Sequence, residues 1–152
     1  MINNLDGFAF GHSQSLFLLD RWIIGEAHKL RGEVLTDYAK VHFFSALKKL
    51  HRFINEDLSG FYFDVIKNRL YLDTGRDRQS AQVALYHLLV IMKDIFATIT
   101  PLLVAEMESI YPTKSDNLSV ISTSSGDVEL VNFIKELRSR MIQTVTELRT
   151  RR

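Results

Sequence analysis

Apolar residues recur along most of this sequence at steps of three and four, the spacing that places them on one face of an α-helix. The first series begins at Leu16 and predicts a helix from about residue 15 to about residue 36. Its other members are Leu19, Ile23, Ala27, Leu30 and Val34. The second series predicts a helix from about residue 40 to about residue 70. It comprises Leu47, Leu50, Ile54, Leu58, Phe61 and Val65.

A third helix is predicted to occupy the centre of the fold. Ser80 fits a helix N-cap, and the sequence from about residue 81 to about residue 99 is apolar on nearly all sides. Thr100 and Pro101 fit the N-cap and the first position of a shorter helix that ends near Tyr111. A helix without a polar face is stable when other helices cover it, so the third helix belongs inside a bundle.

One more helix is predicted near the C-terminus, behind a linker. The linker, at about residues 113–127, is polar and lacks periodicity, and Asp127 then fits the N-cap of a helix from about 128 to about 149. The whole pattern predicts an all-α antiparallel helix bundle over about residues 15–111 with an appended C-terminal helix. We expect residues 1–152 to form a single domain.

Polar residues interrupt the apolar series of the second predicted helix. Asp57, Ser59 and Gly60 favour caps and turns, yet they stand in the middle of this helix. Asp57 and Asp64 are seven residues apart and share a side of the helix, which leaves acid–base chemistry open. Ion pairing is the favoured interpretation, because buried carboxylates are usually paired. The candidate partners are Arg21, Lys67 and Arg69.

Composition excludes several classes of function. Hydrophobic residues make up 46% of the 152 residues, which fits an ordinary globular domain. The absence of cysteine excludes disulfides and thiolate chemistry. No glycine-rich phosphate loop or catalytic motif is present, and the histidines lie on different predicted helices or faces, so neither a catalytic nor a metal site is expected. The longest apolar run is too short and too polar to span a membrane, so no membrane contact is expected.

The net charge of +1 does not by itself indicate a nucleic-acid partner. Local clusters of basic side chains are the relevant evidence for such a partner. Cations and one aromatic side chain share the face of the second predicted helix that points away from its apolar series. They are Lys48, Lys49, Arg52, Phe63 and Lys67. Aromatic rings stack on unpaired RNA bases while cations contact phosphates, so this face is a candidate for RNA binding. The alternatives are that Phe63 packs against another helix and that the charges are only solvated.

The first predicted helix has a second open face. Arg21, Gly25, His28 and Gly32 lie opposite its apolar series. Two glycines leave room for a sugar-phosphate backbone to approach closely, but neutral drift or close helix packing is the favoured explanation.

Four segments resemble a known family. DLSGFYFDVIKNRLY, residues 57–71, resembles the signature of isoleucyl-tRNA synthetases in their helical anticodon-binding domain. LLDRWI at 18–23, RQSAQVAL at 78–85 and ITPLLVAEMESIYP at 99–112 are similar to further segments of that domain, in the same order. The sequence departs from the family pattern at Glu26, Asn68 and Gln79.

The resemblance implies that this chain grips the anticodon stem-loop of an isoleucine-accepting tRNA. Aminoacylation would then occur in the catalytic domain of a cytoplasmic parent ligase, which uses ATP and Mg²⁺, and this segment needs no cofactor. The tRNA-contacting residues we expect are His28, Lys48, Lys49, Arg52, Phe63, Lys67, Arg76, Arg78, Arg138 and Arg140. The polar residues expected to lock the bundle internally are Asp20, Arg21, Asp57, Asp64 and Arg69.

A free-standing helical scaffold or protein-interaction module derived from a synthetase is the alternative. In that case the basic positions lie scattered or pair with carboxylates, whereas RNA binding predicts a continuous positive stripe. The candidate carboxylates are Glu56, Asp73, Asp77 and Glu136.

Overall fold

The computed structural model describes residues 16–72, 75–110 and 127–150, which are helical apart from short connections. This confirms the predicted all-α fold. The chain divides into two compact units, Met1–Ile121 and Ser122–Arg152. The first unit contains α1 (Leu18–Ala39), α2 (Phe43–Arg52), η2 (Phe53–Tyr62), α3 (Phe63–Tyr71), α4 (Arg76–Ile99) and α5 (Pro101–Ile110).

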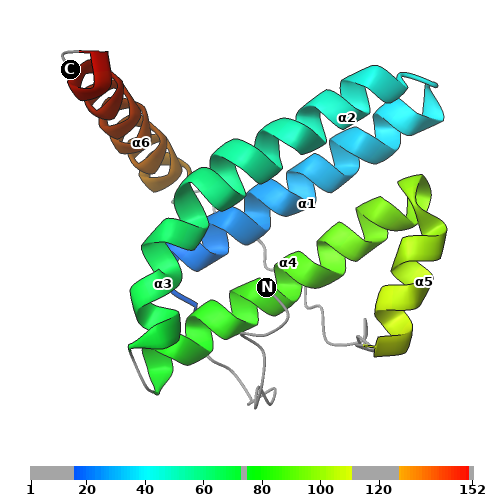
Figure 1. The fold of residues 1–152 in the computed structure, drawn as a ribbon, viewed down its shortest axis with the longest axis horizontal. Helices are drawn as coiled ribbons and strands as arrows, with labels where there is room; N and C mark the ends of the chain where they lie inside the picture. The colour runs from blue at the N-terminus through cyan, green and yellow to red at the C-terminus, as the bar shows by residue number, and fades with distance from the viewer. Residues whose placement is uncertain (1–15, 73–74, 111–126, 151–152) are drawn as a thin grey trace. The chain divides into compact units, whose positions relative to one another are not determined.

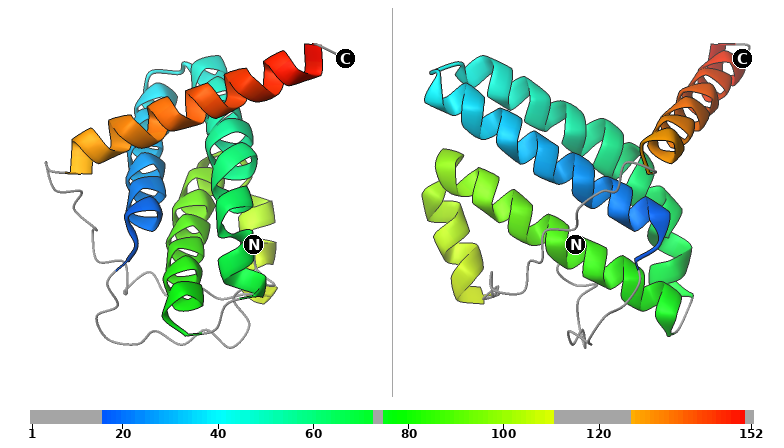
Figure 2. Two further views of the ribbon diagram at one scale, coloured as in Figure 1. Left: turned by 90° about the vertical axis from the view of Figure 1, so that its left-hand side faces the viewer. Right: turned by 180° about the vertical axis from the view of Figure 1, so that it is seen from behind.

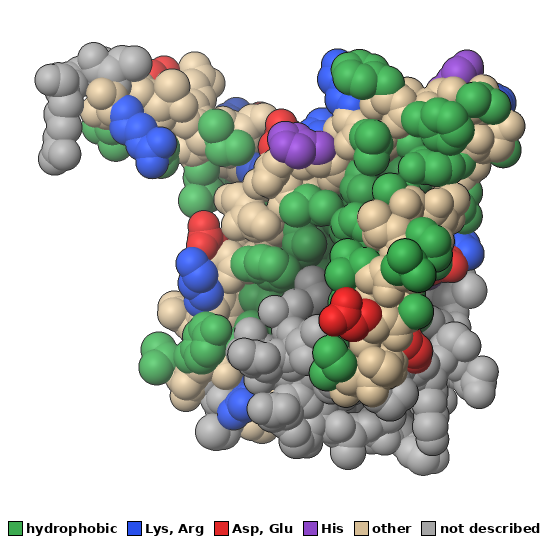
Figure 3. All heavy atoms as spheres, turned by 45° about the vertical axis from the view of Figure 1, so that its right-hand side comes forward, with side chains coloured by type: hydrophobic (Ala, Val, Ile, Leu, Met, Phe, Trp, Pro, Cys, Tyr) green, Lys and Arg blue, Asp and Glu red, His purple; other side chains and the backbone are tan. Residues whose placement is uncertain are grey.

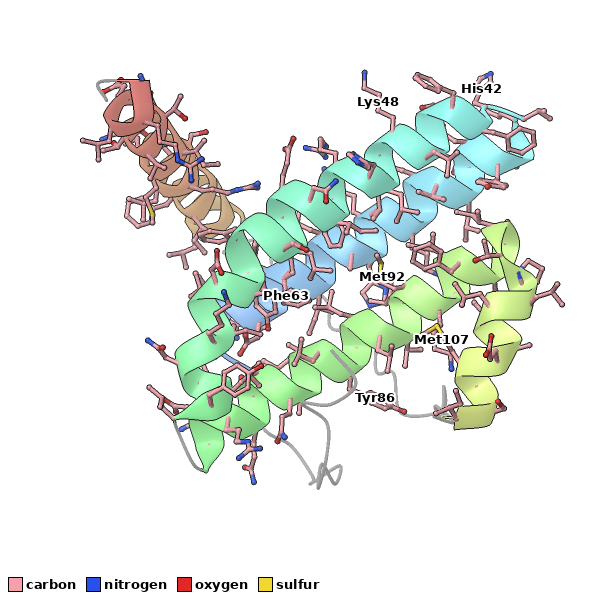
Figure 4. The ribbon with its side chains drawn as sticks, in the orientation of Figure 1. His42, Lys48, Phe63, Tyr86, Met92 and Met107 are labelled. Carbon is pink, nitrogen blue, oxygen red and sulfur yellow. The ribbon has the colours of Figure 1, made fainter. Side chains whose placement is uncertain are left out.

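The helices of the first unit form a bundle around α4. Helices α1 and α2 run antiparallel side by side, α4 lies along α1, and α5 folds back against the end of α4 (Figures 1 and 2). Helix α4 is long and apolar enough to cross a membrane by length and composition alone, but 61% of its most apolar window is buried inside the protein. Met107 lies between α5 and α4 (Figure 4). The prediction of a central apolar helix is therefore confirmed.

Helices α2, η2 and α3 follow one another without a break, and the middle segment is a π-helix of ten residues. At its end the N–H of Phe63 donates to the carbonyl oxygen of Leu58, five residues earlier, where an α-helix would bond four residues back. The predicted second helix is thus present over almost its full length. The wider turn in its middle was not predicted.

The π-helix changes which side chains face the core. Leu47 and Val65, both predicted as core, are 47% and 46% exposed. The buried apolar side chains occur at steps of three to five residues and include Leu50 and Leu58 of the predicted series; they are Ala46, Leu50, Phe53, Leu58, Tyr62, Ile66 and Leu70. The predicted series was right at Leu50 and Leu58 and wrong beyond them, where Tyr62 and Ile66 are buried in place of Phe61 and Val65, because it assumed one α-helical period along a helix that widens in the middle.

Gly60 has a steric reason to stand in this helix. A Cβ atom added at Gly60 would lie 2.7 Å from the carbonyl oxygen of Asn55, a distance that real Cβ contacts essentially never show. The obstacle is backbone, which cannot move aside as a flexible side chain can. The residue that looked misplaced in the sequence is therefore required by the π-helical backbone.

Two predicted helix starts have different outcomes. Pro101 begins α5 as predicted, and α5 is described up to Ile110, so Tyr111 and most of the predicted linker lie outside the described residues. Ser80 does not cap a helix, because α4 begins at Arg76 and Ser80 lies buried in its second turn.

The second unit contains α6, which spans Asp127–Thr150 and confirms the predicted C-terminal helix. Leu137, Met141, Val145 and Leu148, which recur along it at steps of three and four, are exposed.

We predict that Gly60→Ala destabilises the bundle, whereas Gly32→Ala stabilises it. The first change forces a Cβ against the backbone of Asn55, which we expect to cost more than about 1 kcal/mol. A Cβ at Gly32 meets nothing within 4 Å, so alanine there raises stability by about 0.4 to 1 kcal/mol. Urea unfolding followed by circular dichroism measures both. Equal stability of the two variants would contradict the steric role of Gly60.

Candidate nucleic-acid interface

The carboxylate of Asp20, in the first turn of α1, is fully buried and accepts four hydrogen bonds. Tyr62 donates to Oδ1 at 2.8 Å, and Ser80 donates to Oδ2 at 2.6 Å. The Arg69 guanidinium donates to both oxygens, at 2.8 Å and 2.9 Å. Each oxygen therefore has two donors, which satisfies a buried carboxylate. We call these four residues the Asp20 cluster.

The Asp20 cluster also fixes the start of α1. The backbone N–H of Phe17, just before the helix, donates to the Ser80 hydroxyl at 3.1 Å. The guanidinium carbons of Arg69 and Arg76 lie 5.5 Å and 5.9 Å from the centre of the Phe17 ring, within the range of cation–π attraction. Arg76, predicted to contact RNA, is thus placed over an aromatic ring of its own chain.

Burial and charge keep the proton on Tyr62. Burial, together with the negative charge of Asp20, raises the pKa of the Tyr62 hydroxyl well above 10.0. Tyr62 therefore keeps its proton and donates a hydrogen bond to Asp20.

Only part of the predicted polar network meets at this point. Asp20 and Arg69 form its centre, whereas Asp64 is exposed and pairs with Lys67 one turn away. Asp57 is buried and Arg21 is half-buried, and neither has a described hydrogen bond to Asp20. The polar partners that sequence reasoning missed are Tyr62 and Ser80. Both lie in the segments that resemble the synthetase domain, which was the available signal.

Several predicted RNA-contacting cations form ion pairs. Lys49 lies 2.8 Å from Asp37 and 3.5 Å from Glu33, so it ties α2 to α1. The hydrogen bonds from Lys49 and from Ser45 lower the pKa of Asp37 below 3.8. Lys67 pairs with Asp64 on α3. In the second unit Arg140 pairs with Glu136 at 2.7 Å, as the scaffold alternative anticipates.

Two predicted cations on α2 are exposed and make no ion pair with any residue that the structure describes. They are Lys48 and Arg52. Lys48 points away from α1 and α4 at the outer edge of α2 (Figure 4). These are the cations best placed to meet phosphates.

The other predicted contacts are less accessible. Phe63 is half-buried, at the junction of η2 and α3, and its ring centre lies 6.3 Å from that of Tyr62. Arg78 and Arg138 are half-buried too. In the part of the chain that the structure describes, the Nε atom of Arg78 is buried without a hydrogen-bond partner.

His28 belongs to the interior of the bundle more than to its surface. Burial, and then the charge of Arg31, lower its pKa below 6.5. Burial, and then the charge of His28, lower the pKa of His87 on α4 below the same value. Among the described residues, Nε2 of His28 and Nδ1 of His87 are buried and have no hydrogen-bond partner.

Comparison with known proteins identifies a family whose model matches most of this chain. The model of a family described as the anticodon-binding domain of tRNA ligase matches residues 20–152. An isoleucine-tRNA ligase of Stutzerimonas stutzeri (strain A1501) is 37% identical over 118 residues, which are 73% of this chain and 12% of the relative. Another, of Burkholderia orbicola (strain MC0-3), is 30% identical over 142 residues, 87% of this chain and 15% of the relative.

A third similar protein is an isoleucine-tRNA ligase of Kosmotoga olearia (strain ATCC BAA-1733 / DSM 21960 / TBF 19.5.1). It is 32% identical over 114 residues, 74% of this chain and 12% of the relative. This chain thus spans between 12% and 15% of the length of these ligases. No solved structure matches it.

We predict that Asp20→Asn destabilises the first unit by about 3 to 5 kcal/mol, because it leaves the half-buried charge of Arg69 without its partner. Asp64→Asn removes an exposed carboxylate from a solvated pair and should change stability little. Urea unfolding of both variants measures the difference. Similar stabilities would show that the Asp20 cluster does not hold the helices together.

Acidification should destabilise the bundle through its buried histidines. The folded pKa values of His28 and His87 lie below the ordinary value of 6.5, so the unfolded chain binds more protons between the two values. Their contribution is complete above pH 6.5 and is lost as the pH falls through the folded values. Urea unfolding between about pH 7.5 and about pH 5 measures this loss, which His87→Gln should reduce. A pH-independent stability over this range would contradict it.

Proposed function

The chain belongs to the family of anticodon-binding domains of tRNA ligases, and from this we propose that it binds the anticodon stem-loop of an isoleucine-accepting tRNA as one domain of an isoleucine-tRNA ligase. The observation that carries the proposal is the family match over residues 20–152. The geometry supports it, because the Asp20 cluster joins side chains from three of the segments that resemble this domain.

In this proposal the chain supplies binding and orientation. The ligase reaction, with ATP and Mg²⁺, belongs to the catalytic domain of the parent protein in the cytoplasm. Binding energy from a remote part of the tRNA then aligns its acceptor end with the reacting groups. A rigid bundle suits this role, because contacts held at fixed positions lose little entropy on binding.

The scaffold alternative draws on the ion pairs of Lys49, Lys67 and Arg140. These pairs explain part of the basic surface without RNA. They leave Lys48 and Arg52 unexplained, and these two residues distinguish the two functions in an experiment.

We predict salt-dependent binding of the 152-residue chain to the isolated anticodon stem-loop, with weaker binding to a hairpin whose loop is scrambled. Each neutralised phosphate contributes about 0.7 to 0.9 to the slope of log affinity against log salt concentration. Arg52→Ala should therefore lower the slope by almost one. Lys67→Ala should lower it less, because Asp64 already neutralises that ammonium.

Fluorescence anisotropy with labelled RNA measures affinities and slopes. A flat salt titration, or equal affinity for the native and the scrambled loop, would refute the proposed function.

A further inference from the structure

Phe44 is the most exposed phenylalanine among the described residues. Its side chain is 82% exposed in the first turn of α2, although burying such a ring would favour folding. Its neighbour Phe43 is 48% exposed and packs edge-to-face on Tyr38, with ring centres 5.1 Å apart. Phe43 therefore contributes to packing within the bundle, whereas Phe44 is exposed to solvent.

The turn before α2 contains a left-handed residue, and contacts with α1 hold its two sides together. Val41 has a φ of 62°, a left-handed conformation that a β-branched residue rarely adopts. Asp37, in α1 before the turn, accepts hydrogen bonds from Ser45 and Lys49, in α2 after the turn. These contacts hold the first turn of α2, and Phe44 with it, at a fixed place on α1.

Phe44 is followed by Lys48 and Arg52 at steps of four residues, so the three side chains lie in a row along α2. Successive members are about 6 Å apart along the helix axis. Neither cation forms an ion pair with a described residue, whereas their neighbour Lys49 turns toward α1. Figure 3 shows hydrophobic side chains beside basic ones over this end of the first unit.

We propose that Phe44 is a stacking platform for an unpaired base of an RNA loop, and that Lys48 and Arg52 contact the phosphates of the same strand. Stacking on an exposed ring flanked by cations is how proteins bind single-stranded RNA. This inference rests on the proposed function and adds the residue that holds the loop. It differs from the sequence prediction, which assigned stacking to Phe63.

A protein partner fits this row less well. The centre of a protein interface is rich in aromatic residues and arginine but depleted of lysine, and Lys48 stands in the middle of this row. Charge complementarity thus favours a polyanion. The two occupants also respond differently to substitution, because an apolar interface accepts leucine in place of phenylalanine and base stacking does not.

The test measures binding of the 152-residue chain to the anticodon stem-loop of isoleucine tRNA with 2-aminopurine placed in the loop. Phe44→Ala and Phe44→Leu should each weaken binding roughly 5- to 150-fold, and Phe44→Trp should retain it. The 2-aminopurine fluorescence should be quenched by the wild-type chain and by Phe44→Trp only. Lys48→Ala should instead lower the salt slope by about one.

Leu47→Ala is the matched control, since Leu47 is exposed on the same helix but carries no ring, and it should bind like the wild type. Circular dichroism confirms that each variant is folded. If the wild type binds the stem-loop and Phe44→Ala binds equally well, the inference is wrong and the proposed function stands. If the wild type does not bind, both are wrong. If Phe44→Ala abolishes self-association and leaves RNA affinity unchanged, the row is a protein interface and the inference fails.

Discussion

The carboxylate of Asp20 is fully buried, and a buried charge is tolerated only when donors surround it. Its donors come from η2, α3 and α4, so this requirement is met only when all three segments dock against the start of α1. Apolar packing alone accepts small sliding movements of one helix along another. Four hydrogen bonds to the two carboxylate oxygens do not allow such sliding. The Asp20 cluster therefore fixes how far the helices of the bundle are shifted along one another.

The π-helix makes this arrangement possible. Tyr62 is its last residue, and Ile66 and Arg69 follow at four and seven residues, on the same face of α3. The wider turn rotates this face, so that Tyr62, Ile66 and Arg69 point to the core together. Gly60 permits the turn, because any side chain there would strike the backbone of Asn55. The absence of a Cβ at Gly60 thus permits the turn that brings the donors Tyr62 and Arg69 to the buried carboxylate of Asp20 on α1.

The sequence predicted the helices well and their contacts less well. Helix ends depend on local signals such as Pro101 and Asp127, which composition and spacing reveal. The face of α3 depends on a π-helix, and no periodicity search that assumes 3.6 residues per turn detects one. Ser80 has the composition of a cap, and only the position of Asp20 makes it a core donor. The pairing of Lys49 likewise depends on how α2 packs on α1, the helix that precedes it. The existence of the helices was therefore predictable, whereas the π-helical turn and the contacts between segments were not, except where the resemblance pointed to them.

The distribution of charge indicates what kind of binding such a domain supplies. Four of the eight cations predicted to contact RNA, Lys49, Lys67, Arg76 and Arg140, lie against carboxylates or a ring of the same chain, and the net charge is only +1. A surface with few free cations releases few counterions, so it binds RNA weakly wherever no specific contact is made. Weak general attraction favours discrimination, because a wrong hairpin gains little from the charges alone. A ring that accepts a base adds affinity only where the loop is open and unpaired. A bundle that neutralises part of its basic surface within the fold is therefore suited to selective binding more than to general attraction of RNA.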